Sequence, residues 1–246
     1  HYPNPGAAAA EFARVLQPGG VLLLGDCTAP AGLRGVANLF LPLSGEGDVR
    51  LYSGAELAAL RQCCDVHGLF LYLDGARLGT ALMSDASDLG ASDLARLTDA
   101  FYIGGTKVGA LFGEALVLRH EALKEDFRYI AKQKGGRLAK GRLLGIQFLE
   151  LFRDGLYFRL GAHADRLAVM LRDFCRSRGL SLPFSSGTNQ QFVTMPDSVL
   201  EELGRKYGFA YLRREDETHS TVRFCTSWAT REEDVRELMA DIARLC

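Results

Sequence analysis

Short continuous apolar runs and longer stretches with helical spacing alternate along most of the chain. The apolar runs have the length of strands that are buried on both faces of a sheet, and they lie at Val21–Leu24, 69–73, 100–103 and 113–118. Helical spacing predicts helices at 7–16, 55–67, 92–97, 138–152 and 161–178. Gly68 is a typical helix terminator, and Ser92 is predicted to be an N-cap. A helix between two strands implies parallel pairing through a right-handed crossover, so this part of the chain is predicted to be α/β.

From residue 191 onwards the pattern changes to short strands that alternate with helices. Strands are predicted at 191–195, 209–213 and 221–227, and helices at 198–206 and 231–245. This last part is predicted to form a smaller α+β unit. A glycine-rich stretch without sustained periodicity, between about residues 33 and 53, indicates a connection near the N-terminus. We therefore expect three parts, at 1–51, 52–150 and 151–246.

Composition and charge exclude several classes of protein. The 246 residues are 48% hydrophobic and 24% charged, which is ordinary for a globular protein. The 29 basic and 30 acidic residues give a net charge of −1, whereas a dedicated nucleic-acid binder carries a basic surplus. No apolar run approaches the roughly 18 residues that span a bilayer. The six cysteines have neither metal-ligand nor disulfide spacing, which favours a reducing, cytoplasmic location without a bound metal. We expect neither nucleic acid nor membrane as a partner.

Polar motifs follow two of the predicted strands. Asp74-Gly75-Ala76-Arg77 comes after the run at 69–73, and Gly104-Gly105-Thr106-Lys107 after the run at 100–103. Ligands of open parallel sheets bind at the carboxyl ends of the strands, so a carboxylate, an arginine and a lysine are expected at one edge. These residues alone leave an alternative to a ligand site open. Asp74 and Lys107 could form an ion pair with each other or cap the ends of their strands.

The surrounding sequence resembles a known family. The segments LYLDGARLG and DAFYIGGTKVGALFGEALVL are similar to the pyridoxal-phosphate enzymes of the threonine aldolase and β-eliminating lyase family, and the likeness continues through EDFRYIAKQKGGRLAKGRLLGIQF, GTNQQF and DETHSTVRFCTSWAT. It covers about residues 52–243. It implies part of an aminotransferase-like large domain, with a mostly parallel sheet and flanking helices, followed by a small α+β C-terminal domain.

The resemblance also implies roles for individual residues. Lys107 would hold pyridoxal phosphate as a Schiff base. Asp74 would hydrogen-bond the pyridine nitrogen and keep it protonated, which makes the ring an electron sink. Arg77 and Arg223 would bind the substrate α-carboxylate with their planar guanidinium groups. Thr106 and Arg77 would also contact the cofactor.

Further charged and polar residues are weaker candidates. A basic cluster is a candidate for binding a phosphate, in the same chain or in a neighbouring subunit, although a solvated helix start explains it equally well; it consists of Lys132, Lys134, Arg137 and Lys140. His219 lies beside the strand with Arg223 and is a candidate to line the site, while the other internal histidines fit surface or helix-end positions: His67, His120 and His163. Gln190 and Gln191 fit structural roles.

Two features of the family are not recognisable, namely the glycine-rich phosphate loop and a histidine that stacks on the cofactor ring. We therefore expect weak binding of pyridoxal phosphate or none. Residues 2–29 instead resemble a late segment of class I S-adenosylmethionine methyltransferases, in which a helix ending in RVL-x-PGG leads into a central strand. Residues 1–51 are thus either a foreign segment joined near 49–53 or a diverged native one, and in the second case 21–25 lies beside 69–73 in the sheet.

The function that the resemblance implies is a carbon–carbon lyase. It would cleave β-hydroxy-α-amino acids such as L-threonine to glycine and an aldehyde by retro-aldol chemistry, as a homodimer or homotetramer. Two alternatives remain open: a catalytically incomplete fragment or fusion with a methyltransferase remnant, and a β-eliminating lyase acting on an aromatic or sulfur amino acid.

Overall fold

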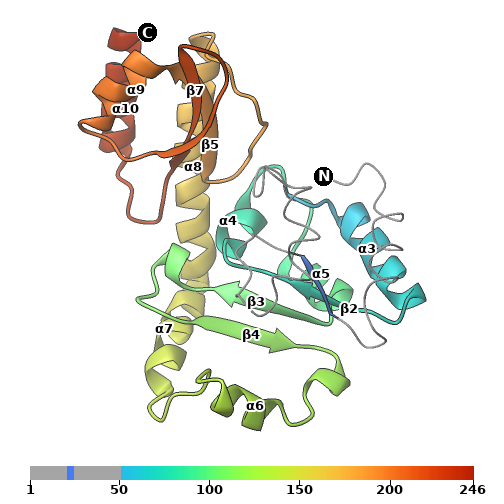
Figure 1. Cartoon of the computed structure of the whole chain (residues 1–246). Coiled ribbons are helices and arrows are strands. Elements are labelled where there is room, and N and C mark those ends of the chain that lie inside the picture. The colour runs from blue at the N-terminus through green and yellow to red at the C-terminus, as the bar shows by residue number, and fades with distance from the viewer. Residues whose placement is uncertain (1–20, 25–50) are drawn as a thin grey trace. The chain divides into compact units, whose positions relative to one another are not determined.

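The computed structural model describes the backbone of residues 21–24 and the chain from residue 51 to residue 246 (Figure 1). The chain forms two compact units. The first contains the described residues up to Leu78 together with Ser87–Thr106 and Ala110–Arg153, and the second contains Gly79–Ala86, Lys107–Gly109 and Asp154–Cys246. The predicted helix at 7–16, most of the predicted connection at 33–53, Cys27 and most of the methyltransferase-like segment lie outside the described residues. The three-part division of the chain stays a prediction.

The first unit contains a four-stranded sheet in the order β1-β2-β3-β4. Its strands are β1 (Val21–Leu24), β2 (Phe70–Leu73), β3 (Ala100–Gly104) and β4 (Glu114–Leu118). The pairs β1–β2 and β2–β3 are parallel, whereas β3–β4 is antiparallel. The predicted mostly parallel sheet is therefore confirmed, and Val21–Leu24 lies beside β2, as expected if residues 1–51 are a diverged native segment.

Two helices of the first unit pack on this sheet and on each other, namely α3 (Gly54–Val66) and α5 (Ala91–Leu97). Helix α3 begins with a capping box, in which Ser53 Oγ accepts the Glu56 N–H at 3.3 Å and Glu56 Oε2 accepts the Ser53 N–H at 2.9 Å. The Asp99 carboxylate, just before β3, accepts a hydrogen bond from Leu71 N–H at 2.6 Å and pairs with Arg61 of α3. This carboxylate joins both strands to the helix.

Several element boundaries differ from the prediction. Helix α5 is capped at Gly90, whose N–H donates to Asp93 Oδ2 at 2.9 Å, so the expected cap at Ser92 is wrong. Helix α7 (Arg142–Phe152) begins after a turn closed by Gly141 N–H and Leu138 C=O, four residues later than expected. The short helices α4 (Leu78–Met83) and α6 (Phe127–Gln133) are not predicted, because six or seven residues carry too little periodicity.

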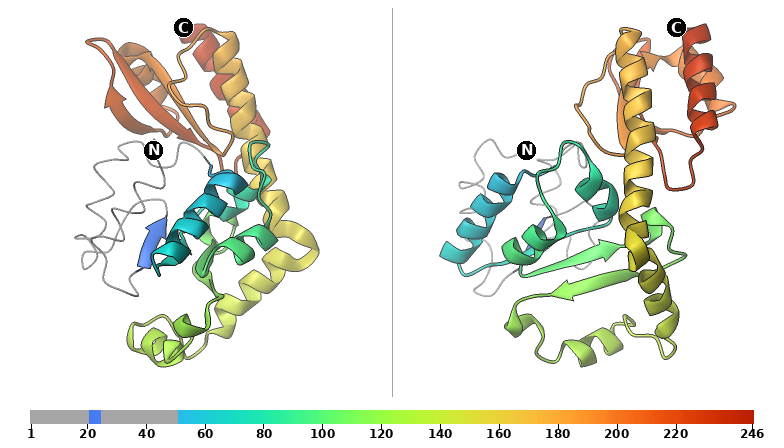
Figure 2. Two further views of the ribbon diagram at one scale, coloured as in Figure 1. Left: turned by 90° about the vertical axis from the view of Figure 1, so that its right-hand side faces the viewer. Right: turned by 180° about the vertical axis from the view of Figure 1, so that it is seen from behind.

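The second unit consists of a three-stranded antiparallel sheet and three main helices (Figure 2). The sheet has the order β5-β7-β6 and is formed by β5 (Gln190–Pro196), β6 (Ala210–Arg214) and β7 (His219–Cys225). The helices are α8 (Leu156–Ser177), α9 (Asp197–Gly204) and α10 (Glu232–Leu245). Helix α8 starts five residues earlier than expected, directly after Gly155, which has a φ of 68°. The predicted strands and helices of this α+β unit are all present.

The core of the second unit lies on one face of its sheet. Val193 and Met195 of β5 and Val222 and Phe224 of β7 are buried there, in one apolar cluster with residues of all three helices. These strand residues alternate along the chain, so they point to the same face. Asp165 of α8 is an exception to the apolar interior of this unit, because its side chain is only 5% exposed and neither carboxylate oxygen has a hydrogen-bond partner among the described residues.

None of the helices in the described part of the chain is long and apolar enough to cross a membrane. Groups of three or more side chains suited to hold a metal ion are likewise absent from the described residues. The cysteines at positions 63, 64, 175, 225 and 246 are thiols.

Candidate active site

Asp74 is the first residue after β2, and two donors orient its half-buried carboxylate. The Ala76 N–H donates to Oδ1 at 3.0 Å, and the hydroxyl of Tyr102 on β3 donates to the same oxygen. Among the described residues, no hydrogen bond reaches Oδ2. The carboxylate is therefore fixed through one oxygen, while its other oxygen is available to a further donor.

Two tyrosines share the face of the sheet on which Asp74 lies. Tyr72 of β2 and Tyr102 of β3 have ring centroids 6.3 Å apart. Burial raises the pKa of Tyr72 to about 12, with the charges of Asp74 and Glu114 adding to the effect. Burial and the hydrogen bond to Asp74 raise the pKa of Tyr102 well above its usual range. Both hydroxyls are therefore neutral at physiological pH, and the Tyr102 hydroxyl is a donor toward Asp74. Tyr102 is not among the residues predicted from the sequence. The usable signal is that it lies two residues after Ala100, the partner of Tyr72, and therefore on the same face as Asp74.

Glycines bring the two polar motifs of the first unit into backbone contact. Gly104 N–H donates to Gly75 C=O at 2.9 Å. A Cβ at Gly75 would lie 1.8 Å from the Tyr102 carbonyl oxygen, and a Cβ at Gly104 would lie 2.3 Å from the Ala76 carbonyl oxygen. Only glycine fits at either position, so the turn after β2 and the turn after β3 are held against each other.

Thr106 and Lys107 come directly after this contact and are both exposed. They begin a single 3-10 turn, Thr106–Val108. A hydrogen bond from Ala110 N–H to Gly105 C=O, at 3.0 Å, joins the backbone before the turn to the backbone after it. The strand order on which the predicted site rests is confirmed, because both motifs follow adjacent parallel strands.

The two arginines belong to different units, and each is described by its own surroundings. Arg77 is half-buried in the turn between β2 and α4. Arg223 lies on the central strand β7, in register with Phe192 of β5 and Ala210 of β6. The Nε of Arg223 is buried and has no acceptor among the described residues. A buried guanidinium donor without an acceptor is costly, so this atom fits an anion that arrives with a ligand.

Part of the predicted basic cluster surrounds a surface hollow of about 370 Å³ in the first unit. Arg128, Lys132 and Arg137 line it together with Tyr129, Leu138 and Ala139. Lys134 and Lys140 are not among its lining residues. Three cations around one hollow make it suited to an anion such as phosphate.

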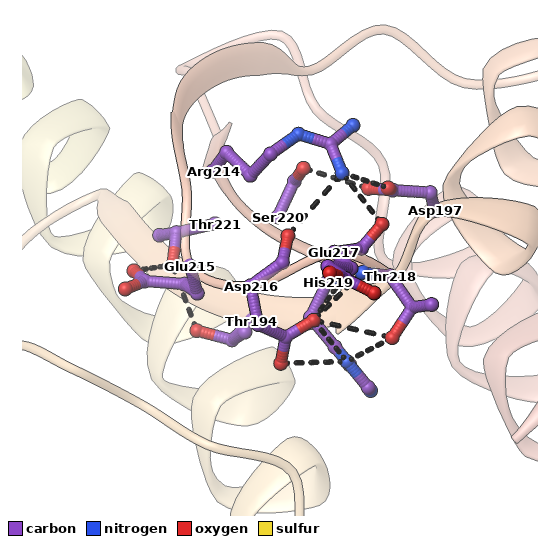
Figure 3. Close-up of polar contacts among 10 residues, drawn as sticks. All are labelled: Thr194, Asp197, Arg214, Glu215, Asp216, Glu217, Thr218, His219, Ser220 and Thr221. Atoms are coloured by element: carbon purple, nitrogen blue, oxygen red, sulfur yellow. Dashed lines mark hydrogen bonds and ion pairs between the residues drawn. The ribbon is translucent and has the colours of Figure 1, made fainter.

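The histidines of the described chain contribute less to the candidate site than the charged residues above. His219 binds the turn between β6 and β7, where its Nδ1 lies 3.1 Å from Asp216 Oδ1 and its N–H donates to the same oxygen at 2.9 Å (Figure 3). The hydrogen bond from the Thr218 N–H, together with those from His219, lowers the pKa of Asp216 to about 2. His120 is exposed as expected, but His163 is half-buried, with Nε2 2.8 Å from the Thr230 carbonyl oxygen.

Gln190 and Gln191 are buried, which agrees with structural roles. Gln191 Nε2 donates to the carbonyl oxygens of Ser186 and Thr188 at 3.3 and 2.9 Å. These bonds fix the segment that leads into β5.

The fold of the chain is that of the aminotransferase-like enzymes. Aspartate aminotransferase from Thermus thermophilus superimposes with a TM-score of 0.61, at 15% identity over 99% of this chain and 60% of that chain. At this identity the likeness shows the fold alone.

The β-eliminating lyase family model matches residues 48–198, and the chain belongs to that family. Threonine aldolase from Leishmania major is 33% identical, with a TM-score of 0.81 over 98% of this chain and 82% of that structure. A low specificity L-threonine aldolase from Pseudomonas sp. (strain NCIMB 10558) is 36% identical over 202 residues, which are 78% of this chain. This chain spans 55% of the length of that relative.

Proposed function

We propose that the chain carries the catalytic lysine and the substrate-binding half of a pyridoxal-phosphate-dependent aldehyde-lyase. The enzyme cleaves β-hydroxy-α-amino acids, with L-threonine as the reference substrate, to glycine and an aldehyde. The observation that supports this most directly is the Asp74 carboxylate, oriented through one oxygen and held in backbone contact with the start of the GGTK motif. The threonine aldolases among its relatives supply the substrate class.

The residues present fit the ring nitrogen and the aldehyde of pyridoxal phosphate and the carboxylate of an amino-acid substrate. Asp74 Oδ2 accepts no hydrogen bond from the described residues and suits the N–H of a protonated pyridine ring. Lys107 is an exposed amine in a glycine-flanked turn and suits covalent attachment of an aldehyde. The orphaned Nε of Arg223 suits the carboxylate of an amino acid.

Each residue then has one task in the cleavage. When bound, the cofactor supplies an electron sink for the bond that breaks at the substrate α-carbon. Asp74 holds a proton on the ring nitrogen, and Lys107 anchors the cofactor. Arg223 and Arg77 bind the α-carboxylate and so set which bond at the α-carbon is cleaved. Thr106 contacts the cofactor beside Lys107.

The overall reaction balances without another reactant. The bond between the α- and β-carbons breaks, the β-hydroxyl loses its proton as the aldehyde forms, and the α-carbon gains a proton to give glycine. We assign no residue as the base for the hydroxyl, because no histidine of the described chain is placed for it by the contacts above.

The hollow lined by Arg128, Lys132 and Arg137 is proposed as a phosphate contact, in this chain or in a neighbouring subunit. Cations in this position would neutralise a dianion without competing for Asp74.

We further propose that the protein is a homo-oligomer in a reducing, cytoplasmic setting. Helix α7 exposes an apolar row at a spacing of three residues, formed by Leu143, Ile146, Leu149 and Phe152 at 41–60% exposure. Leu111 and Leu116 of the same unit are also exposed. A second copy that covers this row would remove a large apolar patch from water. Leu149→Asp should reduce the mass seen in sedimentation velocity, whereas Tyr211→Asp, at an exposed position of the other unit, should leave the association state unchanged. An unchanged mass for Leu149→Asp contradicts the proposed face.

The experiment that tests the function is reductive labelling. The chain is mixed with excess pyridoxal phosphate, its visible absorbance is recorded, the mixture is reduced with borohydride, and the modified peptide is located by mass spectrometry. We expect the added mass on Lys107 and its loss in Lys107→Ala. Labelling of Lys132 instead, or an equal yield in Lys107→Ala, contradicts the proposal.

Product analysis separates the alternatives. Release of glycine and acetaldehyde from threonine supports the aldolase. Release of ammonia and a keto acid from an aromatic or sulfur amino acid indicates β-elimination. Binding of S-adenosylmethionine without labelling indicates a methyltransferase, and labelling without any turnover indicates an incomplete site.

A further inference from the structure

The loop that carries Lys107 is fixed at its first residue by a carboxylate from the next strand. Gly105 N–H donates to Glu114 Oε2 at 2.8 Å. Gly105 C=O accepts the hydrogen bond from Ala110 N–H at 3.0 Å. The N–H and the C=O of Gly105 are thus both hydrogen-bonded. Gly105 is therefore the fixed point at which the loop begins and to which its end, at Ala110, is bonded.

Gly105 is closely packed at its Cα, while the acceptor Glu114 lies at an exposed position. Gly105 is buried, and a Cβ there would lie 2.7 Å from the Gly113 carbonyl oxygen and 2.9 Å from the Phe148 ring. Gly113 has a φ of +92°, which turns the chain directly into β4 at Glu114. Glu114 pairs in register with Gly104, the residue before Gly105, so its side chain is in position to reach back to the Gly105 N–H.

We propose that Glu114 is a positioning residue for Lys107. It accepts the Gly105 N–H, holds the loop in one conformation and so presents the Lys107 amine to an incoming aldehyde in a constant orientation. This inference rests on the proposed function of Lys107 as the attachment point, but Glu114 itself has no need to touch substrate or cofactor.

The geometry makes a specific demand on position 114. An acceptor oxygen is needed at the end of a side chain with two methylene groups. Gln keeps this oxygen and loses the charge, Asp keeps the charge but is one methylene shorter, and Ala has no acceptor. If positioning is the role, Gln restores function and Asp does not; if negative charge is the role, the order is reversed.

The first measurement is hydrogen–deuterium exchange at the Gly105 amide in the full chain without cofactor. Hydrogen bonds to charged groups are strong enough that their loss changes a local equilibrium by about 10- to 100-fold. We expect exchange to be faster by about that factor in Glu114→Ala and Glu114→Asp, and by a clearly smaller factor in Glu114→Gln, whose neutral oxygen accepts a weaker hydrogen bond. Glu125→Ala, at an exposed position, is the matched control.

The second measurement is the rate of borohydride-dependent labelling of Lys107 at a fixed pyridoxal phosphate concentration. We expect a drop of about tenfold in Glu114→Ala and recovery in Glu114→Gln. Unchanged Gly105 exchange in Glu114→Ala, or Glu114→Gln exchanging as fast as Glu114→Ala, overturns the positioning role. Absence of labelling on Lys107 in the wild type overturns the proposed function, while the exchange result still decides whether Glu114 orders the loop.

Discussion

Asp74→Asn is expected to lower the rate of threonine cleavage by about two to three orders of magnitude, the usual loss when one electrostatic contact to the transition state is removed. The substitution keeps the shape of the side chain. Its amide oxygen still accepts the hydrogen bonds from Ala76 N–H and Tyr102, so the turn after β2 keeps its structure. The atom at the position of Oδ2 becomes a donor, which cannot hold a proton on the ring nitrogen.

The assay measures glycine and acetaldehyde, with labelling of Lys107 as the readout of cofactor attachment. We expect labelling to persist in Asp74→Asn while turnover falls. Asp126→Asn is the matched control, because Asp126 is exposed and its left-handed backbone, with a φ of 51°, is readily adopted by Asn. Equal turnover in Asp74→Asn and in the wild type would show that the ring nitrogen faces another residue.

The second large effect concerns stability and its dependence on pH. Burial raises the pKa of Asp165 from 3.8 to about 8, and the charge of Asp85 adds to the shift. Between about pH 4 and pH 8 the folded state therefore keeps a proton that the unfolded state has released. The free energy of unfolding falls as the pH rises through this range, by up to about 1.4 kcal/mol per pH unit, and levels off above pH 8.

Asp165→Asn removes this titration, so the variant should lose less stability than the wild type between pH 5 and pH 8. Its advantage is expected to be greatest at pH 8, as measured by urea unfolding at each pH. Asp173→Asn on the same helix is the control, because its side chain is 54% exposed. If the free energy of unfolding changes by the same amount between pH 5 and pH 8 in the wild type and in Asp165→Asn, a buried, protonated Asp165 is refuted.

The main elements could be predicted from the sequence because each carries a strong local signal. β2 and β3 are short apolar runs flanked by glycine or polar residues, and α3 has a capping residue and a terminating Gly68. Helix starts were less predictable. The turn closed by Gly141 and the left-handed Gly155 decide where α7 and α8 begin, and neither changes the apolar spacing.

Only those residues of the candidate site that strand order or the family resemblance indicates could be predicted from the sequence. Asp74 and Lys107 were found because they follow strands in motifs with glycine. Tyr102 and Glu114 read as ordinary strand residues, and their roles appear only once the β2–β3 and β3–β4 registers are known. Asp165 is one of several charged residues of the amphipathic helix α8, and its burial beside the Asn189 backbone is not visible in the helical spacing.

The backbone contact between Gly75 and Gly104 has a consequence for how this sequence can change over generations. A side chain at either glycine forces the two turns apart, and once they are apart a side chain at the other adds little further damage. The two positions are therefore expected to be epistatic, so a descendant that has lost one glycine is under little pressure to keep the other. A lineage in which both glycines have been replaced would lose the backbone contact between its two polar motifs, and this loss can be read from its sequence.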